Sequence, residues 1–81
     1  MKSAWLMCKR ILPGMFSDEA VATFVRRDGE EESHFVRLSS VNFNTQSIKV
    51  DVLERESFVW ARLPTQHLTQ VAVLRDNILW H

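Results

Sequence analysis

The stretch Ser47–Leu63, SIKVDVLERESFVWARL, has the most regular pattern in the chain. Apolar β-branched residues alternate with polar ones up to a charged tripeptide, Glu54–Glu56, and an aromatic and aliphatic run, Phe58–Leu63, follows. Alternation with a period of two is typical of half-buried β-strands. We therefore predict a β-hairpin with its tip at Arg55-Glu56 and with these facing pairs: Val52 and Val59, Val50 and Ala61, and Ile48 and Leu63.

The two faces of this predicted hairpin differ in character. One face is wholly apolar and is expected in the core; it consists of Ile48, Val50, Val52, Val59, Ala61 and Leu63. The other face mixes aromatic, aliphatic and charged side chains, namely Lys49, Asp51, Leu53, Phe58, Trp60 and Arg62. The apolar face predicts how the chain folds, and the mixed face is the candidate for a functional surface.

The chain has 81 residues, and we expect a single domain over residues 1–81 because compact domains usually have about 50–200 residues. A chain this short buries a limited fraction of its surface, so its stability margin is thin and self-association is a common remedy. The 10 basic and 10 acidic residues cancel. This balance disfavours, without excluding, a nucleic-acid binder, and it argues against a surface that works by attracting anionic membranes.

The single cysteine, Cys8, can form neither an intrachain disulfide nor a cysteine-rich zinc site. We expect it to act as a small buried hydrophobe. The apolar run Ala4–Cys8 is too short for a secretory signal, and no segment approaches the about 20 apolar residues of a membrane span. These features predict a cytoplasmic protein.

The segments outside the hairpin also favour strands. Residues 1–12 favour a strand but leave a short helix open, and Pro13-Gly14 ends that segment. Asp28-Gly29 predicts a second hairpin, with either a two-residue turn that pairs Arg27 with Glu30 or a three-residue loop that shifts every partner by one. Residues 64–68 suit a turn or one turn of 3₁₀ helix, before a strand at 69–74 and an edge strand or latch at 78–80. Two connectors are expected to point apolar side chains inward: Met15, Phe16, Val41 and Phe43.

Five clear strands, with a sixth expected at the N-terminus, are joined by connections of about two to eight residues. This spacing predicts an all-β fold, a small antiparallel β-barrel or strongly bent sheet of five to six strands, with an SH3-like or OB-like barrel preferred. The alternative is an α+β fold with a short helix at the N-terminus or at residues 64–68.

No residue pattern assigns a catalytic, cofactor or metal site. The three histidines, His34, His67 and His81, have no metal-ligand spacing. Gly14 and Gly29 are the only glycines, which excludes a glycine-rich phosphate loop. The acidic pairs fall in predicted turns, where a solvated carboxylate keeps an ordinary pKa and is a poor general acid. We therefore expect a protein that is not an enzyme and has no cofactor.

The mixed face of the hairpin is the one site that the sequence predicts, an interface or ligand face formed by Lys49, Leu53, Phe58, Trp60 and Arg62. The same face would instead be buried within the monomer if Met1–Leu12 or Ile78–Trp80 covered it. A contiguous apolar patch of this kind is unusual on a monomer without a partner.

The sequence leaves three functional hypotheses from different classes. We expect protein–protein association, foremost as a homo-oligomer. The alternative is a single-stranded nucleic-acid module that stacks bases on Phe58 and Trp60 beside Lys49 and Arg62. The third is a small-ligand pocket or enzyme site at a subunit interface, where residues such as His34 or His67 converge.

Overall fold

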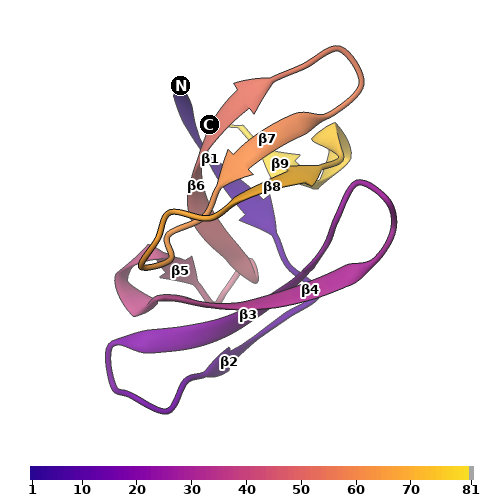
Figure 1. The fold of residues 1–81 in the computed structure, drawn as a ribbon. Helices are drawn as coiled ribbons and strands as arrows, with labels where there is room; N and C mark the ends of the chain where they lie inside the picture. The colour runs from indigo at the N-terminus through magenta and orange to yellow at the C-terminus, as the bar shows by residue number, and fades with distance from the viewer. Residues whose placement is uncertain (81) are drawn as a thin grey trace.

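The computed structural model describes residues 1–80, which form nine β-strands and two three-residue 3₁₀ helices (Figure 1). The predicted all-β class is confirmed, and every strand pair is antiparallel. The larger sheet has the order β8 (Gln70–Val73), β7 (Val59–Arg62), β6 (Ser47–Glu54), β1 (Lys2–Met7) and β9 (Ile78–Leu79), and β5 (Val41–Asn42) also pairs with β6. The smaller sheet has the order β2 (Arg10–Pro13), β3 (Glu19–Val25) and β4 (Glu31–Arg37).

Short helical turns occur where the chain leaves a sheet. The 3₁₀ helix η1 (Leu38–Ser40) follows β4, and η2 (Arg75–Asn77) connects β8 to β9. The helix that we considered for the N-terminus is absent, because residues 2–7 are strand β1. The helix considered for residues 64–68 is a turn instead, in which the backbone N–H of Leu68 donates to the Thr65 carbonyl at 3.1 Å and Leu68 has a φ of 52°.

One hydrophobic core lies between the two sheets. The predicted apolar hairpin face is buried as a block: Ile48 and Ala61 are 0% exposed and Val50 and Val52 are 2% exposed. The smaller sheet contributes Ile11, Ala20, Ala22, Phe24 and Val36, and all of these belong to the same cluster. Burial of both sheets against one another is what holds this short chain together, because apolar burial is the dominant favourable term in folding.

The register of the β6–β7 hairpin corrects the prediction by two residues. Val52 faces Ala61 rather than Val59, and Glu54 faces Val59. The backbone N–H of Arg55 donates to the Phe58 carbonyl at 2.9 Å, so the tip is Glu56-Ser57 and Phe58 belongs to the loop. Because side chains alternate with a period of two, an even slip leaves both faces with the same residues.

The N-terminal strand is broken into two strands that belong to different sheets. Between β1 and β2, the backbone N–H of Cys8 donates to the Gln46 carbonyl and that of Lys9 to the Thr23 carbonyl, at 2.8 and 2.7 Å. This switch lets Leu6 and Ile11, five positions apart, both face the core, with exposed fractions of 0% and 5%. A continuous strand would have placed them on opposite sides.

The β3–β4 hairpin adopts the three-residue loop, which was one of two registers left open. Phe24 faces Glu32 and Val25 faces Glu31. The backbone N–H of Arg26 donates to the Glu30 carbonyl at 2.8 Å and that of Gly29 to the Arg26 carbonyl at 2.9 Å. Gly29 has a φ of 90°, a backbone conformation that costs little only for glycine.

Three apolar residues expected inside are exposed. Met15 and Phe16 in the β2–β3 connector are 86% and 68% exposed, and Phe43 is 45% exposed. Val41 does pack against the core, as predicted.

A closed barrel is not found, because the two sheets meet through single hydrogen bonds rather than through a ladder of paired strands. The backbone N–H of Arg27 donates to the Ala72 carbonyl at 2.7 Å, and that of Arg37 donates to the Pro64 carbonyl at 3.0 Å. These bonds connect the smaller sheet to β8 and to the segment that follows β7. No helix within residues 1–80 has the length and apolar character needed to cross a membrane.

Candidate functional site

The predicted functional face is the outer face of the larger sheet, on the side away from the core. Strand β6 places Lys49 and Leu53 there, β7 places Trp60 and Arg62 there, and Phe58 lies in the loop before β7. Leu53 is the direct cross-strand neighbour of Trp60. The rings of Phe58 and Trp60 meet edge to face, with centroids 5.4 Å apart and an interplanar angle of 77°. The structure therefore brings three of the five predicted residues into one cluster.

The chain ends widen this face instead of covering it. Strand β1 pairs with β6, and β9 pairs with β1, so both lie beside β6 in the plane of the sheet. They add Trp5 and Leu79, which are register partners of one another, next to Lys49. Leu53 and Leu79 are each 39% exposed, and Trp60 is half-buried. Burial by the chain ends, which we considered from the sequence, does not occur.

A polar row divides the outer face into two apolar groups. Four successive register partners cross the sheet in this row: Ser3, Asp51, Arg62 and Gln70. Arg62 donates to the Asp51 carboxylate at 2.9 Å, while the Nε atom of Arg62 is buried with no hydrogen-bond partner. One apolar group lies on each side of the row, Trp5 with Leu79 and Leu53 with Trp60 and Ala72.

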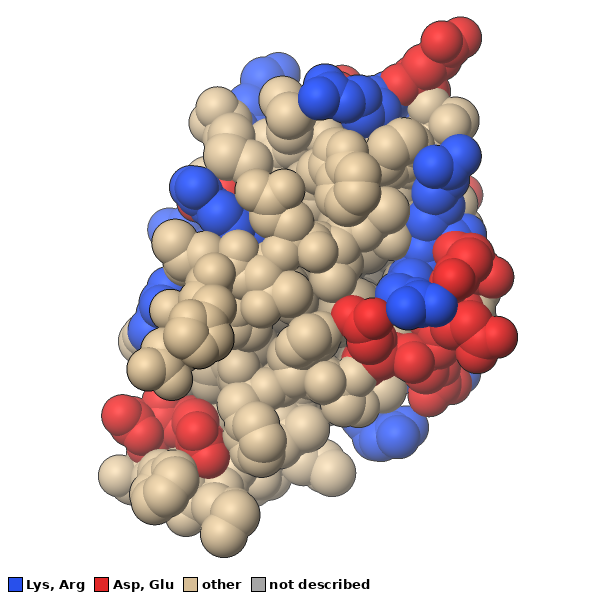
Figure 2. All heavy atoms as spheres, viewed as in Figure 1, with Lys and Arg blue, Asp and Glu red and all other residues tan. Residues whose placement is uncertain are grey.

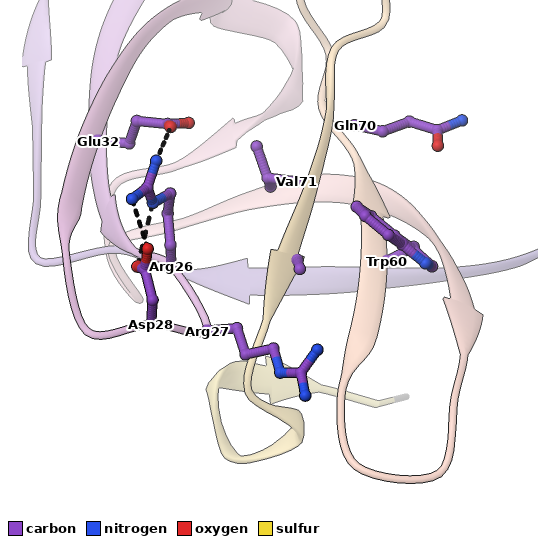
Figure 3. Close-up of a pocket in the computed structure, with 8 residues that line it drawn as sticks. Arg26, Arg27, Asp28, Glu32, Trp60, Gln70 and Val71 are labelled. Carbon is purple, nitrogen blue, oxygen red and sulfur yellow. Dashed lines mark hydrogen bonds and ion pairs between the residues drawn. The ribbon is translucent and has the colours of Figure 1, made fainter.

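A pocket of about 370 Å³ lies where the second apolar group meets the β3–β4 turn (Figure 3). Its walls include Arg27 from the turn, Trp60 from β7, and Gln70 and Ala72 from the edge strand β8. The Arg27 guanidinium lies 4.2 Å from the centre of the Phe58 ring, a favourable cation–π contact. Arg27 has no ion pair with any residue in the described range 1–80. The pocket therefore combines an aromatic wall and a cation that has no ion-pair partner among the described residues with the ion-paired side chains of Arg26, Asp28 and Glu32.

Arg27 and its neighbours could not be found from sequence patterns. The three-residue loop turns the backbone of Arg27 toward β8, where its N–H bonds the Ala72 carbonyl. In an antiparallel ladder every second residue of an edge strand points its backbone groups outward, and Ala72 is such a residue on β8. The contact joins residues 45 positions apart, so no local signal marks it.

All three guanidinium nitrogens of the neighbouring Arg26 donate hydrogen bonds to carboxylates. It donates to the Asp28 carboxylate at 2.5 and 3.1 Å and to the Glu32 carboxylate at 3.1 Å, and the other Glu32 oxygen lies 2.8 Å from His34 Nε2. The hydrogen bond with His34, together with Arg26, lowers the pKa of Glu32, and the bond from Arg26 lowers the pKa of Asp28. Carboxylates stabilised in the ionised form are weak proton acceptors. This cluster is therefore suited to ordering the turn rather than to acid–base chemistry.

The charge distribution around the pocket is uneven. In the view of Figure 2, acidic and basic side chains gather beside the β3–β4 turn, and uncharged surface occupies the centre of the molecule. Among residues 1–80, no three His, Cys, Asp or Glu side chains are grouped so that they could hold a metal ion. Burial raises the pKa of the Cys8 thiol to about 12, so Cys8 is not poised as a nucleophile.

Comparison of this chain with protein-family models, with curated proteins and with solved structures returned no match.

Proposed function

We propose that this protein is a non-enzymatic module that acts by protein–protein association, and first of all by self-association, through the outer face of the larger sheet. The observation that carries the proposal is the uncovered aromatic and aliphatic surface around Trp60. Leu53 beside Trp60 and Leu79 across the polar row are each 39% exposed, although on the opposite face of β6 the side chains of Ile48, Val50 and Val52 are exposed by 2% or less.

The composition of the face suits a protein partner. Association surfaces are enriched in aromatic residues and arginine, and their charged groups lie around or between the apolar contacts. Here Trp60 and Phe58 supply the aromatic surface, and the Asp51–Arg62 ion pair crosses its middle. A polar row of this kind favours one alignment of the partner over others, because a misaligned partner would bury the two charges against apolar groups.

The size of the chain supports the same reading. A chain of 81 residues has few contacts with which to offset the entropy of folding, and burying the outer face against another subunit would add to them. In the Glu32–His34–Arg26 cluster, the hydrogen bonds from His34 and Arg26 lower the pKa of Glu32, so this carboxylate is unsuited to act as a general acid.

The test is the mass of the protein in solution, measured by sedimentation equilibrium or light scattering across the micromolar range. The wild type should gain mass as its concentration rises, and Leu53→Arg should weaken association by about tenfold or more, because it places a charge in the contact. Phe35→Arg is the matched control, since Phe35 is 56% exposed on β4 of the other sheet. A wild type that stays monomeric throughout would refute the proposal.

A second candidate is a module for single-stranded nucleic acid. The observation in its favour is the Arg27 guanidinium stacked on Phe58 beside Trp60, since such proteins stack bases on aromatic rings next to cations. The acidic run Glu30–Glu32 in the same turn would repel a phosphate backbone, and for this reason we rank it second. Quenching of tryptophan fluorescence by oligo(dT), steeply reduced by salt, would support it.

We also propose that the two sheets form an open arrangement related to an SH3-like or OB-like barrel. Its support is the pair of bridging bonds from Arg27 and Arg37, which bring the free edges of the two sheets together at two places. An experimental structure in which these edges pair along their length would establish the closed form.

A further inference from the structure

The β2–β3 connector presents the two most exposed large apolar side chains among residues 1–80. Met15 is 86% exposed and Phe16 is 68% exposed. They are next to each other in sequence, and the exposed acidic residue Asp18 follows two positions later. Large apolar side chains left in water in this way mark contact sites more often than isolated surface residues do.

The backbone of this connector is held by hydrogen bonds. The N–H of Gly14 donates to the Glu19 carbonyl at 3.1 Å, and the N–H of Glu19 donates to the Phe16 carbonyl at 3.3 Å. The Asp18 carbonyl accepts from the N–H of Leu38 at 2.9 Å, which ties the connector to the end of β4. A segment ordered before it binds loses less conformational entropy on association, so its apolar side chains contribute more of their burial to affinity.

The pocket beside Arg27 has the complementary properties. Ala72 and Trp60 give it an apolar floor and wall, and its other side is lined by Arg26 with its two ion-pair partners, Asp28 and Glu32. Its volume of about 370 Å³ is within the range of about 300–1,000 Å³ typical of binding pockets. Arg27 is fixed at both ends, because its backbone bonds Ala72 and its guanidinium stacks on Phe58. Neither Arg27 nor Asp18 has an ion-pair partner within the part of the chain that the structure describes.

The two surfaces cannot meet within one molecule. The connector lies before the first residue of β3 and the Arg27 turn lies after its last residue, so they are at opposite ends of that strand (Figure 1). The seven residues of β3 span about 20 Å, at about 3.3 Å per residue, and this separation is far beyond the reach of an ion pair. Each surface therefore needs a second molecule to satisfy it.

We propose that Met15 and Phe16 of one copy dock into the pocket of Arg27, Trp60 and Ala72 on the next copy, with Asp18 placed against Arg27. This inference rests on the proposed self-association, because Trp60 belongs to the face proposed above, and it names the segment that the face receives. The contact joins two different surfaces, so it is heterologous and repeats from copy to copy into a ring or a filament.

Two variants test this arrangement separately and together. The connector variant is Met15→Ser with Phe16→Ser, and the pocket variant is Ala72→Glu, which fills the floor and neutralises Arg27. Met15 and Phe16 are exposed and Ala72 is half-buried, so circular dichroism and a urea midpoint are measured for each variant to check that it remains folded. Phe35→Ser is the control, because it also removes an exposed phenylalanine but lies on the outer face of the smaller sheet.

The expected masses are specific to a heterologous contact. The wild type and Phe35→Ser should form species larger than a dimer, and each variant alone should lose about tenfold or more of its association constant. An equimolar mixture of the two variants should form a 1:1 dimer that grows no further, because each partner keeps one intact surface.

Three results would overturn the inference. Wild-type assembly that stops at a dimer contradicts a repeating contact, and a mixture of the two variants that stays monomeric contradicts the pairing of connector with pocket. Assembly that survives the connector variant but is lost in Leu53→Arg refutes only this inference and leaves the proposed function standing. A wild type that is monomeric at every concentration refutes the proposed function itself, and the inference with it.

Discussion

Phe24 and Phe35 give a matched test of the fold, because they lie on the same β-hairpin and face opposite ways. Phe24 is 0% exposed, and its ring stacks on His34 with centroids 5.9 Å apart, whereas Phe35 is 56% exposed. Truncating a buried phenylalanine to alanine costs about 3–5 kcal/mol, since it removes apolar contacts and leaves a cavity. Truncating an exposed side chain away from special features changes stability by about 0.5 kcal/mol or less.

These magnitudes are large relative to the stability of the whole molecule. At about 0.05–0.15 kcal/mol per residue, a chain of 81 residues unfolds with a free energy of about 4–12 kcal/mol. Phe24→Ala therefore removes about a quarter or more of that free energy. With a urea m-value of about 1–2 kcal/mol per molar, the unfolding midpoint should fall by about 1.5 M or more.

The assay is urea unfolding followed by tryptophan fluorescence, with the wild type and both variants measured side by side. Phe35→Ala should keep a midpoint close to that of the wild type, and Phe24→Ala should be much less stable or unfolded in water. Equal shifts for the two variants would refute the packing of the smaller sheet against the larger one, because that packing alone makes the two phenylalanines different.

Two further predictions concern ionisable groups. Because burial raises the pKa of Cys8 to about 12, its thiol should react with a disulfide reagent at about pH 8 far more slowly in the native protein than in urea, and equal rates would contradict its burial. The hydrogen bond with His34 and that from Arg26 lower the pKa of Glu32 below its ordinary 4.5, so this stabilisation is complete above pH 4.5 and is lost as the pH falls through the lower folded value. Unfolding free energies measured from about pH 6 to about pH 3 should therefore fall less steeply in Glu32→Gln than in the wild type, and identical slopes would contradict the role of this cluster.

Side-chain alternation predicted what each residue of the β6–β7 hairpin faces but not which residue it pairs with. A slip of two leaves the pattern unchanged, so Val52 is buried whether it faces Val59 or Ala61. Turn geometry decides the register, and the tip residues Glu56-Ser57 include neither glycine nor asparagine to mark it. At Asp28-Gly29 the turn signal was present, and it limited the register to two choices, one of which is observed.

The candidate site was predictable only in the part that one hairpin builds. Leu53, Phe58 and Trp60 come together because β6 and β7 are neighbours in sequence. Arg27 and Ala72 come to the same site because the Arg27 N–H donates to the Ala72 carbonyl. These residues are far apart in the sequence, and no local sequence pattern predicts their contact. The sequence left open whether the chain ends cover the face, and they do not, because strand pairing places β1 and β9 beside β6 and widens its surface.

The exposure of Met15 and Phe16 distinguishes a requirement of folding from a requirement of association. Side chains that are 86% and 68% exposed contribute little to the core, so replacing both with serine should leave the monomer about as stable as before. The connector backbone would keep its own hydrogen bonds, because those bonds involve main-chain atoms of Gly14, Phe16 and Glu19. A chain with a thin stability margin thus holds two large apolar side chains in water on an ordered segment without benefit to its own fold. A second molecule that removes those side chains from water would give this arrangement a physical rationale. For this reason we propose the connector, rather than another surface of the smaller sheet, as the partner of the outer face.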